Sequence, residues 1–272
     1  MEATPYCEMF TMPAAGEEDH PRRRLLTVLE EMMETAGRHA DLLGAGVRHL
    51  HAKGLTWVLA RLHVKVMNVP AARQSVHIAT WPSGRNRIFA VREFRLTDGA
   101  GVDLLRATSA WAMMNMETRR PSRLDPHLQV FSRHPERMVE DDFAPLPPPY
   151  PQAGRTSHRA EAADIDLNDH VNNTVYLGWA LRSAPQGALS WEPLSLEAAF
   201  LGEARLGDEV TCLTEIGRTA ALDAGRTAAL DAGRGEGGAV LLQSLRDAAS
   251  GRELTRLRTY WQTGQKIMKN AI

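Results

Sequence analysis

The sequence contains few cysteines and lacks any long apolar run. Its two cysteines, Cys7 and Cys212, cannot build a disulfide framework or a four-thiolate zinc site, which favours a reducing compartment. No apolar run approaches the roughly 18 residues that a membrane-spanning helix needs. The N-terminal residues MEATPYCEMF carry acidic side chains and lack the apolar stretch of a secretory signal. The composition therefore predicts a cytoplasmic protein that does not insert into a membrane.

A large excess of charge of either sign is also lacking. The formal net charge is -1 at pH 7 and the pI is about 6.8, so no nucleic-acid partner is expected. This average conceals residues 42–92, which contain eight basic and no acidic side chains. A basic region of this kind would steer an acidic partner, although for any single arginine the solvated face of a strand is the simpler explanation. The basic residues of this stretch and of the cluster that follows it are Arg48, Lys53, Arg61, Lys65, Arg73, Arg85, Arg87, Arg92, Arg119, Arg120 and Arg123.

Proline is concentrated near the middle of the chain. Residues 141–155, DDFAPLPPPYPQAGR, contain five prolines, which lack an amide donor and restrict φ. We expect an extended linker there rather than a helix or strand. A chain of 272 residues can form one large domain or two smaller ones. The linker divides it into a predicted N-terminal domain, residues 1–140, and a predicted C-terminal domain, residues 156–272.

Hydrophobic periodicity predicts the same series of elements in both parts. Residues 25–43 have apolar side chains at i, i+3 and i+4, which indicates an amphipathic helix that ends at Gly44 and Gly46. One helix followed by four consecutive strands occurs twice, which favours antiparallel pairing, an α+β fold and an internal duplication. The predicted strands are 58–67, 75–81, 88–97 and 104–115 in the first part; the second part has a helix at 172–183 and strands at 194–203, 209–216, 239–247 and 253–262.

A literal repeat interrupts the second part. GRTAALDA occupies residues 217–224 and again 225–232. Glycine at every eighth position would break a helix, and surface loops tolerate added length at little cost. We interpret the repeat as an insertion in a hairpin loop, with a partner-binding arm as the alternative.

The densest polar cluster is DIDLNDHVNN, residues 164–173, at the start of the second predicted helix. If this segment is extended, Asp166, Asn168 and His170 share one face, because alternate side chains of a strand point the same way. Asn172 or Asn173 would cap the helix and leave first-turn N–H groups available to an anionic oxygen. A carboxylate base, an amide and an imidazole beside such donors are suited to hydrolysis of a carbonyl compound.

The spacing of this cluster also bears on two other interpretations. A calcium loop would require glycine and glutamate where the sequence has Asp169 and Val175, so calcium is not expected. An Asx-rich helix cap without chemistry remains open on spacing alone. The sequence has no serine-hydrolase elbow and no nucleotide-binding glycine motif. The histidines outside the cluster fit no standard metal spacing, so neither a metal nor a cofactor is predicted.

Segments across most of the chain resemble one enzyme family. DIDLNDHVNNTVYLGWAL resembles the second-domain motif of acyl-ACP thioesterases, which release the fatty acyl chain from acyl carrier protein. GLTWVLARLHVKV at 54–66 and WAMMNMETRRPSRL at 111–124 are similar to first-domain signatures of the family, and ETAGRHADLLG at 34–44 is similar to its first helix. The resemblance implies a double hotdog fold, in which each half wraps an antiparallel sheet around a long helix. It also implies acyl carrier protein as the partner.

Carried over by position, the resemblance implies that Asp166 is the catalytic carboxylate, with Asn168 and His170 around it. A glutamate that relatives use on the next strand corresponds to Glu203. Plant relatives often have a cysteine after this glutamate, whereas Ala204 stands there in this sequence, which favours a carboxylate mechanism over a thiol mechanism. The first domain is expected to hold the acyl chain in an apolar tunnel. The residues predicted to contact substrate are Asn172, Asn173 and Trp57.

The sequence leaves several alternatives open. An acyl-CoA thioesterase would differ only in the carrier, and a non-catalytic hotdog protein would bind acyl thioesters without hydrolysing them. Asp166 could act as a general base on water or attack the thioester directly. Whether the chain forms a homodimer is not fixed either, because a double hotdog already contains the pairing that single hotdogs achieve as dimers.

Overall fold

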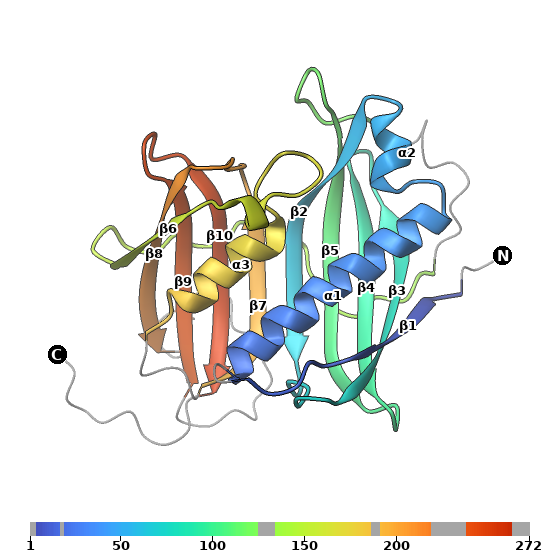
Figure 1. Ribbon diagram of the computed structural model, residues 1–272, viewed down its shortest axis with the longest axis horizontal. Helices are drawn as coiled ribbons and strands as arrows, with labels where there is room; N and C mark the ends of the chain where they lie inside the picture. The colour runs from blue at the N-terminus through green and yellow to red at the C-terminus, as the bar shows by residue number, and fades with distance from the viewer. Residues whose placement is uncertain (1–3, 17–18, 125–133, 186–190, 219–237, 263–272) are drawn as a thin grey trace. The chain divides into compact units, whose positions relative to one another are not determined.

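The computed structural model of the chain describes residues 4–16, 19–124, 134–185, 191–218 and 238–262 (Figure 1). Most of both GRTAALDA copies lies outside these residues, so their interpretation as a loop insertion stays a prediction. Contacts divide the chain into two units, Met1–Glu18 with Arg24–Ala144 and Asp19–Arg23 with Pro145–Ile272. None of the described helices is both long enough and apolar enough to cross a membrane.

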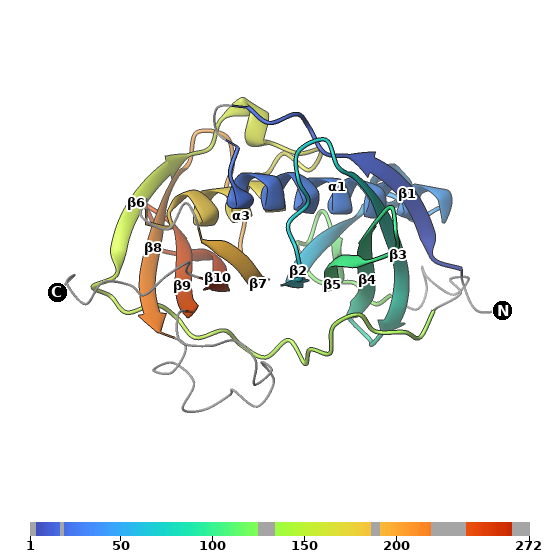
Figure 2. The ribbon, with the colours of Figure 1, turned by 90° about the horizontal axis from the view of Figure 1, so that it is seen from below.

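The described part of the first unit consists of antiparallel strands and two helices. These are β1 (Tyr6–Thr11), α1 (Pro21–Leu42), α2 (Val47–His51), β2 (Leu55–Val66), β3 (Ser75–Arg85), β4 (Phe89–Asp98) and β5 (Asp103–Asn115). The first residues of α1, up to Arg23, belong to the second unit. The strands pair in the order β1-β3-β4-β5-β2, and α1 runs along one face of this sheet (Figures 1 and 2).

The apolar stripe of α1 accounts for its packing. Leu25 and Met32 are fully buried, at a spacing that places them on one face of the helix. Further along that helix, His39 contacts the sheet, because its Nδ1 lies 3.1 Å from Nη1 of Arg92 in β4. The chain leaves the helix at Gly44, whose φ of +69° is a left-handed conformation that glycine adopts without a Cβ clash.

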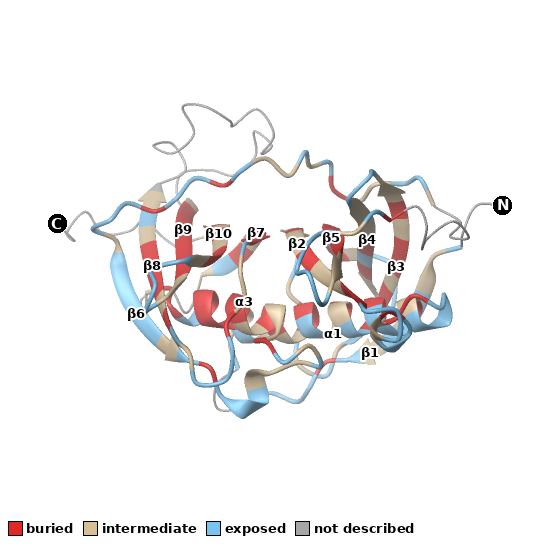
Figure 3. Cartoon of the chain, turned by 90° about the horizontal axis from the view of Figure 1, so that it is seen from above, coloured by how far each residue is buried: buried red, intermediate tan, exposed pale blue. Residues whose placement is uncertain are grey.

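The second unit repeats this plan. Its described elements are β6 (Gly154–Arg159), the 3₁₀ turn η1 (Ala162–Asp164), α3 (Asn173–Arg182), β7 (Glu192–Phe200), β8 (Glu209–Arg218), β9 (Gly238–Asp247) and β10 (Glu253–Gln262). The antiparallel order is β7-β10-β9-β8-β6. Helix α3 is largely buried and β6 is largely exposed (Figure 3). Gln243 of β9 fixes the helix to the sheet, since its Nε2 donates to the Ala180 carbonyl at 2.7 Å.

The predicted helix and four strands of each half are confirmed, with differences at the edges. Strands β1 and β6 and the short helix α2 were not predicted. Because β6 begins at Gly154, the predicted linker, 141–155, extends too far at its C-terminal end. The predicted strand 194–203 ends instead at Phe200. This last difference matters for the site, because Glu203 lies outside the strand.

Candidate active site

Residues 165–171 form a tight turn rather than the extended segment expected from alternation. Ile165 and Val171 pair in an antiparallel bridge, and the Asp166 N–H donates to the His170 carbonyl at 2.9 Å. Asp169 has a φ of +61°, a left-handed conformation that aspartate tolerates better than most residues. The extended prediction is wrong because these local hydrogen bonds reverse the chain within five residues.

The turn itself brings Asp166 and Asn168 together. Oδ1 of Asp166 accepts the backbone N–H of Asn168 at 2.8 Å, and Oδ2 lies 3.4 Å from Nδ2 of the same residue. Both residues are partly exposed. A carboxylate can accept about four hydrogen bonds, so Asp166 keeps lone pairs for water or a substrate while it supports the turn.

A second pair joins this turn to the loop after β7. Nε2 of His170 lies 3.1 Å from Oε2 of Glu203. The imidazole is buried, whereas a third of the Glu203 side chain is exposed. A carboxylate at this distance holds the imidazole in one orientation and determines which ring nitrogen carries the proton. The structure therefore pairs the predicted residues as Asp166 with Asn168 and His170 with Glu203.

The start of α3 lies directly after the turn. Oδ1 of Asn172 caps the helix by accepting the backbone N–H and the hydroxyl of Thr174, each at 3.1 Å. This settles which of the two asparagines is the cap. Asn173 is the first helical residue, and within the described ranges its side chain forms no hydrogen bond. A substrate oxygen could therefore use the side-chain amide of Asn173, whereas the backbone N–H groups of Thr174 and Val175 already donate to Asn172.

Tyr176 is a residue of this region that sequence reasoning missed. Its hydroxyl oxygen accepts the backbone N–H of Ala204, the residue after Glu203, at 2.7 Å. Burial raises the pKa of Tyr176 to about 12; the hydrogen bond from Ala204 and the charge of Arg252 oppose this increase, and the carboxylates of Asp208 and Asp166 add to it slightly. The available signal was its position four residues after Asn172, which places both residues on the same side of α3.

Trp57 and Cys212 both pack in the protein core. The indole N–H of Trp57 donates to the Ala45 carbonyl at 2.9 Å, and the ring packs on a core cluster around Leu50 and Met113 in the first unit. Its predicted contact with substrate stays a prediction. Cys212 is fully buried in β8, as expected for a small apolar residue, and burial raises the pKa of its thiol.

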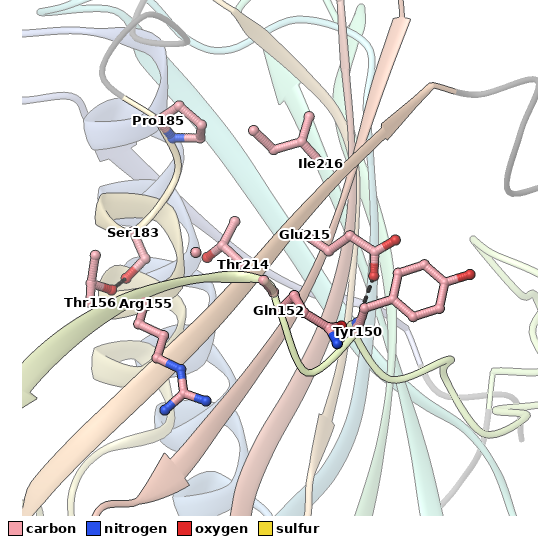
Figure 4. Close-up of a pocket in the computed structure, with 11 residues that line it drawn as sticks. Tyr150, Gln152, Arg155, Thr156, Ser183, Pro185, Thr214, Glu215 and Ile216 are labelled. Carbon is pink, nitrogen blue, oxygen red and sulfur yellow. Dashed lines mark hydrogen bonds between the residues drawn. The ribbon is translucent and has the colours of Figure 1, made fainter. Parts of the chain in front are cut away.

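A pocket of about 540 Å³ lies at the other end of α3, near its C-cap Ser183 (Figure 4). A ten-residue helix is about 15 Å long, so this pocket is separate from the turn that carries Asp166. Two of its polar side chains contact each other: the hydroxyls of Thr156 and Ser183 lie 2.5 Å apart. The predicted site residues do not line it.

Comparison with known proteins identifies the family. The acyl-ACP thioesterase N-terminal domain matches residues 6–130, and the acyl-ACP thioesterase C-terminal domain matches residues 151–263. The chloroplastic oleoyl-acyl carrier protein thioesterase of Coriandrum sativum is 30% identical over 265 residues, which cover 87% of this chain and 71% of the relative. The chloroplastic oleoyl-acyl carrier protein thioesterase 1 of Arabidopsis thaliana is 28% identical over 282 residues, covering 94% and 76%.

Solved structures share the fold over nearly the whole chain. An acyl-ACP thioesterase from Bacteroides thetaiotaomicron has a TM-score of 0.75 at 21% identity, covering 95% of this chain and 98% of that one. The 12:0-ACP thioesterase from Umbellularia californica has a TM-score of 0.77 at 23% identity, covering 95% and 94%. The predicted α+β double hotdog fold is thereby confirmed. The chain belongs to the acyl-ACP thioesterase family, and it is a thiolester hydrolase.

Proposed function

We propose that this protein hydrolyses the thioester of fatty acyl-[acyl carrier protein] to free fatty acid and carrier thiol, and so ends fatty-acid synthesis. The observation that supports this assignment most directly is the meeting of two polar pairs, Asp166 with Asn168 and His170 with Glu203, in front of α3. In this proposal residues 156–272 supply the chemistry. Residues 1–140 hold the acyl chain, and Trp57 contacts it.

The carboxylate of Asp166 can promote hydrolysis of the thioester by either of two routes. As a general base it accepts a proton from water while the water oxygen adds to the carbonyl carbon. As a nucleophile it forms an acyl anhydride and expels the carrier thiolate, and water then cleaves the anhydride. In both routes the thiolate leaves and takes up a proton. The side-chain amides of Asn168 and Asn173 stabilise the oxyanion, and the His170–Glu203 pair orients the water.

Rapid acid quenching followed by mass spectrometry separates the two routes. A peptide that contains Asp166 and carries the mass of the acyl group at single-turnover times supports the covalent route. A peptide that stays unmodified at all single-turnover times supports the general-base route.

The carrier protein is assigned to a basic surface of the first unit, here called the basic end. It lies at the end of the sheet where β2 and β4 begin and β5 ends, because Leu55 of β2 pairs with Asn115 of β5 and Phe89 of β4 pairs with Ala112 of β5. All five of its cations are exposed, and the apolar side chains of Ile88 and Met116 lie among them in the sequence, 40% exposed each. The cations of the basic end are Lys53, Arg87, Arg119, Arg120 and Arg123.

Backbone hydrogen bonds hold the segments of the basic end together. The Met116 N–H donates to the Gly54 carbonyl at 2.9 Å, and the Asn115 N–H donates to the Arg120 carbonyl at 3.0 Å. Not all of the basic residues in the range 42–92 belong to this surface. Arg92 is directed towards α1, where Nη1 contacts Nδ1 of His39, and burial lowers the pKa of its guanidinium to about 10. An acidic carrier would be attracted by the five exposed cations.

Charge reversal tests this docking surface. The double variant Arg119→Glu and Arg120→Glu should raise KM for acyl-ACP by about tenfold and weaken the dependence of KM on salt, because two cations of the basic end are replaced by carboxylates. Hydrolysis of an uncharged acyl-N-acetylcysteamine thioester should not change. Arg106→Glu, at the opposite end of β5, is the matched control. An unchanged KM for acyl-ACP would place the docking surface elsewhere.

A panel of acyl thioesters tests the activity itself. Faster turnover of acyl-ACP than of acyl-CoA at equal chain length supports the proposal. Turnover of acyl-CoA alone would make the protein an acyl-CoA thioesterase, and binding without turnover would make it a non-catalytic hotdog protein. A cytoplasmic location and a homodimer stay predictions; the plant relatives named above are chloroplastic proteins.

A further inference from the structure

The backbone around Glu203 is held in an unusual way. Glu203 lies beyond the end of β7, so no strand ladder fixes it. Three hydrogen bonds from separate parts of the second unit do so instead. Nη2 of Arg252 donates to the Glu203 carbonyl at 2.9 Å. The Ala204 N–H donates to Oη of Tyr176 at 2.7 Å, and the Ala204 carbonyl accepts the N–H of Val171 at 2.9 Å.

Tyr176 is a rigid anchor for this loop. Its side chain is 1% exposed, and its ring packs edge-on against Trp179 with the centroids 5.5 Å apart. It stands on α3, which Asn172 caps and Gln243 fixes to the sheet. A hydroxyl held by a helix fixes the position of the Ala204 N–H and, with it, the backbone that carries the Glu203 side chain.

Arg252 holds the same loop from the hairpin between β9 and β10. Its guanidinium passes so close to Gly202 that an added Cβ there would lie 2.8 Å from Nη1. Glycine at this position therefore permits the arginine to reach the Glu203 carbonyl. The side chain of Arg252 is exposed, so its removal leaves the core intact.

We propose that Tyr176 and Arg252 are positioning residues that hold Glu203 against His170. Neither needs to touch the substrate: each bonds to the backbone of the Glu203 loop and acts through the 3.1 Å contact between Nε2 of His170 and Oε2 of Glu203. The inference rests on the proposed function, because it assumes that Glu203 contributes to turnover.

A double-mutant cycle tests this inference. Tyr176→Phe keeps the ring and removes only the acceptor, and it should lower kcat for acyl-ACP by about 10- to 100-fold with little change in KM. In a Glu203→Ala background the same substitution should lower kcat by less than about twofold, because residues that act as a unit are not additive. Tyr6→Phe, which removes a hydroxyl bonded to Glu8 in the first unit, is the matched control and should retain wild-type kcat.

Arg252→Ala provides a second variant if Tyr176→Phe fails to fold by circular dichroism, and it should give the same cycle with Glu203→Ala. An equal loss of kcat in both backgrounds would overturn the inference, because the anchor would then not act through Glu203. Wild-type kcat in Tyr176→Phe and Arg252→Ala, with an impaired Glu203→Ala, would overturn the inference alone. Wild-type kcat in Glu203→Ala would overturn both the inference and the proposed role of Glu203.

Discussion

The buried histidine of α1 makes the stability of the first unit sensitive to acid. The imidazole of His39 is 8% exposed, and its Nδ1 lies 3.1 Å from Nη1 of Arg92. A guanidinium only donates, so this nitrogen accepts and the imidazole is neutral. The ring also stacks on Tyr6, with the centroids 5.0 Å apart. Burial, and after it the charge of Arg92, lowers the pKa of His39 to about 4.

The sign and size of the effect follow from proton linkage. The folded state binds this proton less readily than the unfolded chain, whose histidine pKa is near 6.5. The contribution of neutral His39 to stability is therefore complete above pH 6.5 and is lost as the pH falls towards 4. For a histidine with these two pKa values, lowering the pH from 7 to 5 reduces the unfolding free energy by about 2 kcal/mol.

Urea titration of the wild type and of His39→Asn at both pH values measures this cost. The oxygen of asparagine can replace Nδ1 as the acceptor for Arg92, but it does not titrate. The wild type should lose about 2 kcal/mol more than the variant on acidification, whatever the variant loses at pH 7. Equal losses in the two proteins would refute the assignment of a buried, neutral His39.

Three further predictions concern stability and the thiols. Asn172→Ala should lower the unfolding free energy by about 1 kcal/mol through loss of the helix cap, and Asn173→Ala should lower it by less; urea midpoints that fall equally would contradict the cap. Glu93→Gln should lower the unfolding free energy by about 3 kcal/mol, because Glu93 is fully buried and Arg137, whose Nε lies 2.8 Å from Oε1 of Glu93, would lose its counter-ion; a loss below about 1 kcal/mol would show that this pair is not needed. Iodoacetamide should label exposed Cys7 but not buried Cys212 and should leave turnover intact; inactivation by the reagent would argue for a thiol mechanism.

Periodicity predicted the helices and strands that bury an apolar face. Residues 25–43 and 172–183 became α1 and α3, and the eight predicted strands correspond to β2 to β5 and β7 to β10. Edge strands lack this signal. The side chains of β6, GRTSHR, are mostly exposed, so only its backbone pairing with β8 makes it a strand. Such pairing leaves no trace in the hydrophobic pattern.

The candidate site was only partly accessible from the sequence. The motif and its resemblance supplied Asp166, Asn168, His170 and Glu203, but the assumption of an extended segment missed the turn that pairs them. The contacts of Tyr176 and Arg252 with the Glu203 loop could not be predicted in this way, because they join residues that are far apart in the sequence. The contact from Tyr176 spans 28 residues, and the contact from Arg252 spans 49. Only the folded chain brings these groups to the Glu203 loop.

Hydrolysis of acyl-ACP by Asp166→Asn, compared with Asp169→Asn, tests the central claim most directly. Both substitutions remove one carboxylate from the same turn. Asparagine keeps the acceptor for the Asn168 N–H at position 166 and tolerates the left-handed conformation at position 169. We predict that Asp166→Asn lowers kcat at least about 100-fold and that Asp169→Asn stays within about twofold of the wild type. Wild-type turnover in Asp166→Asn would contradict the assignment of Asp166 as the group that attacks the thioester or activates its water.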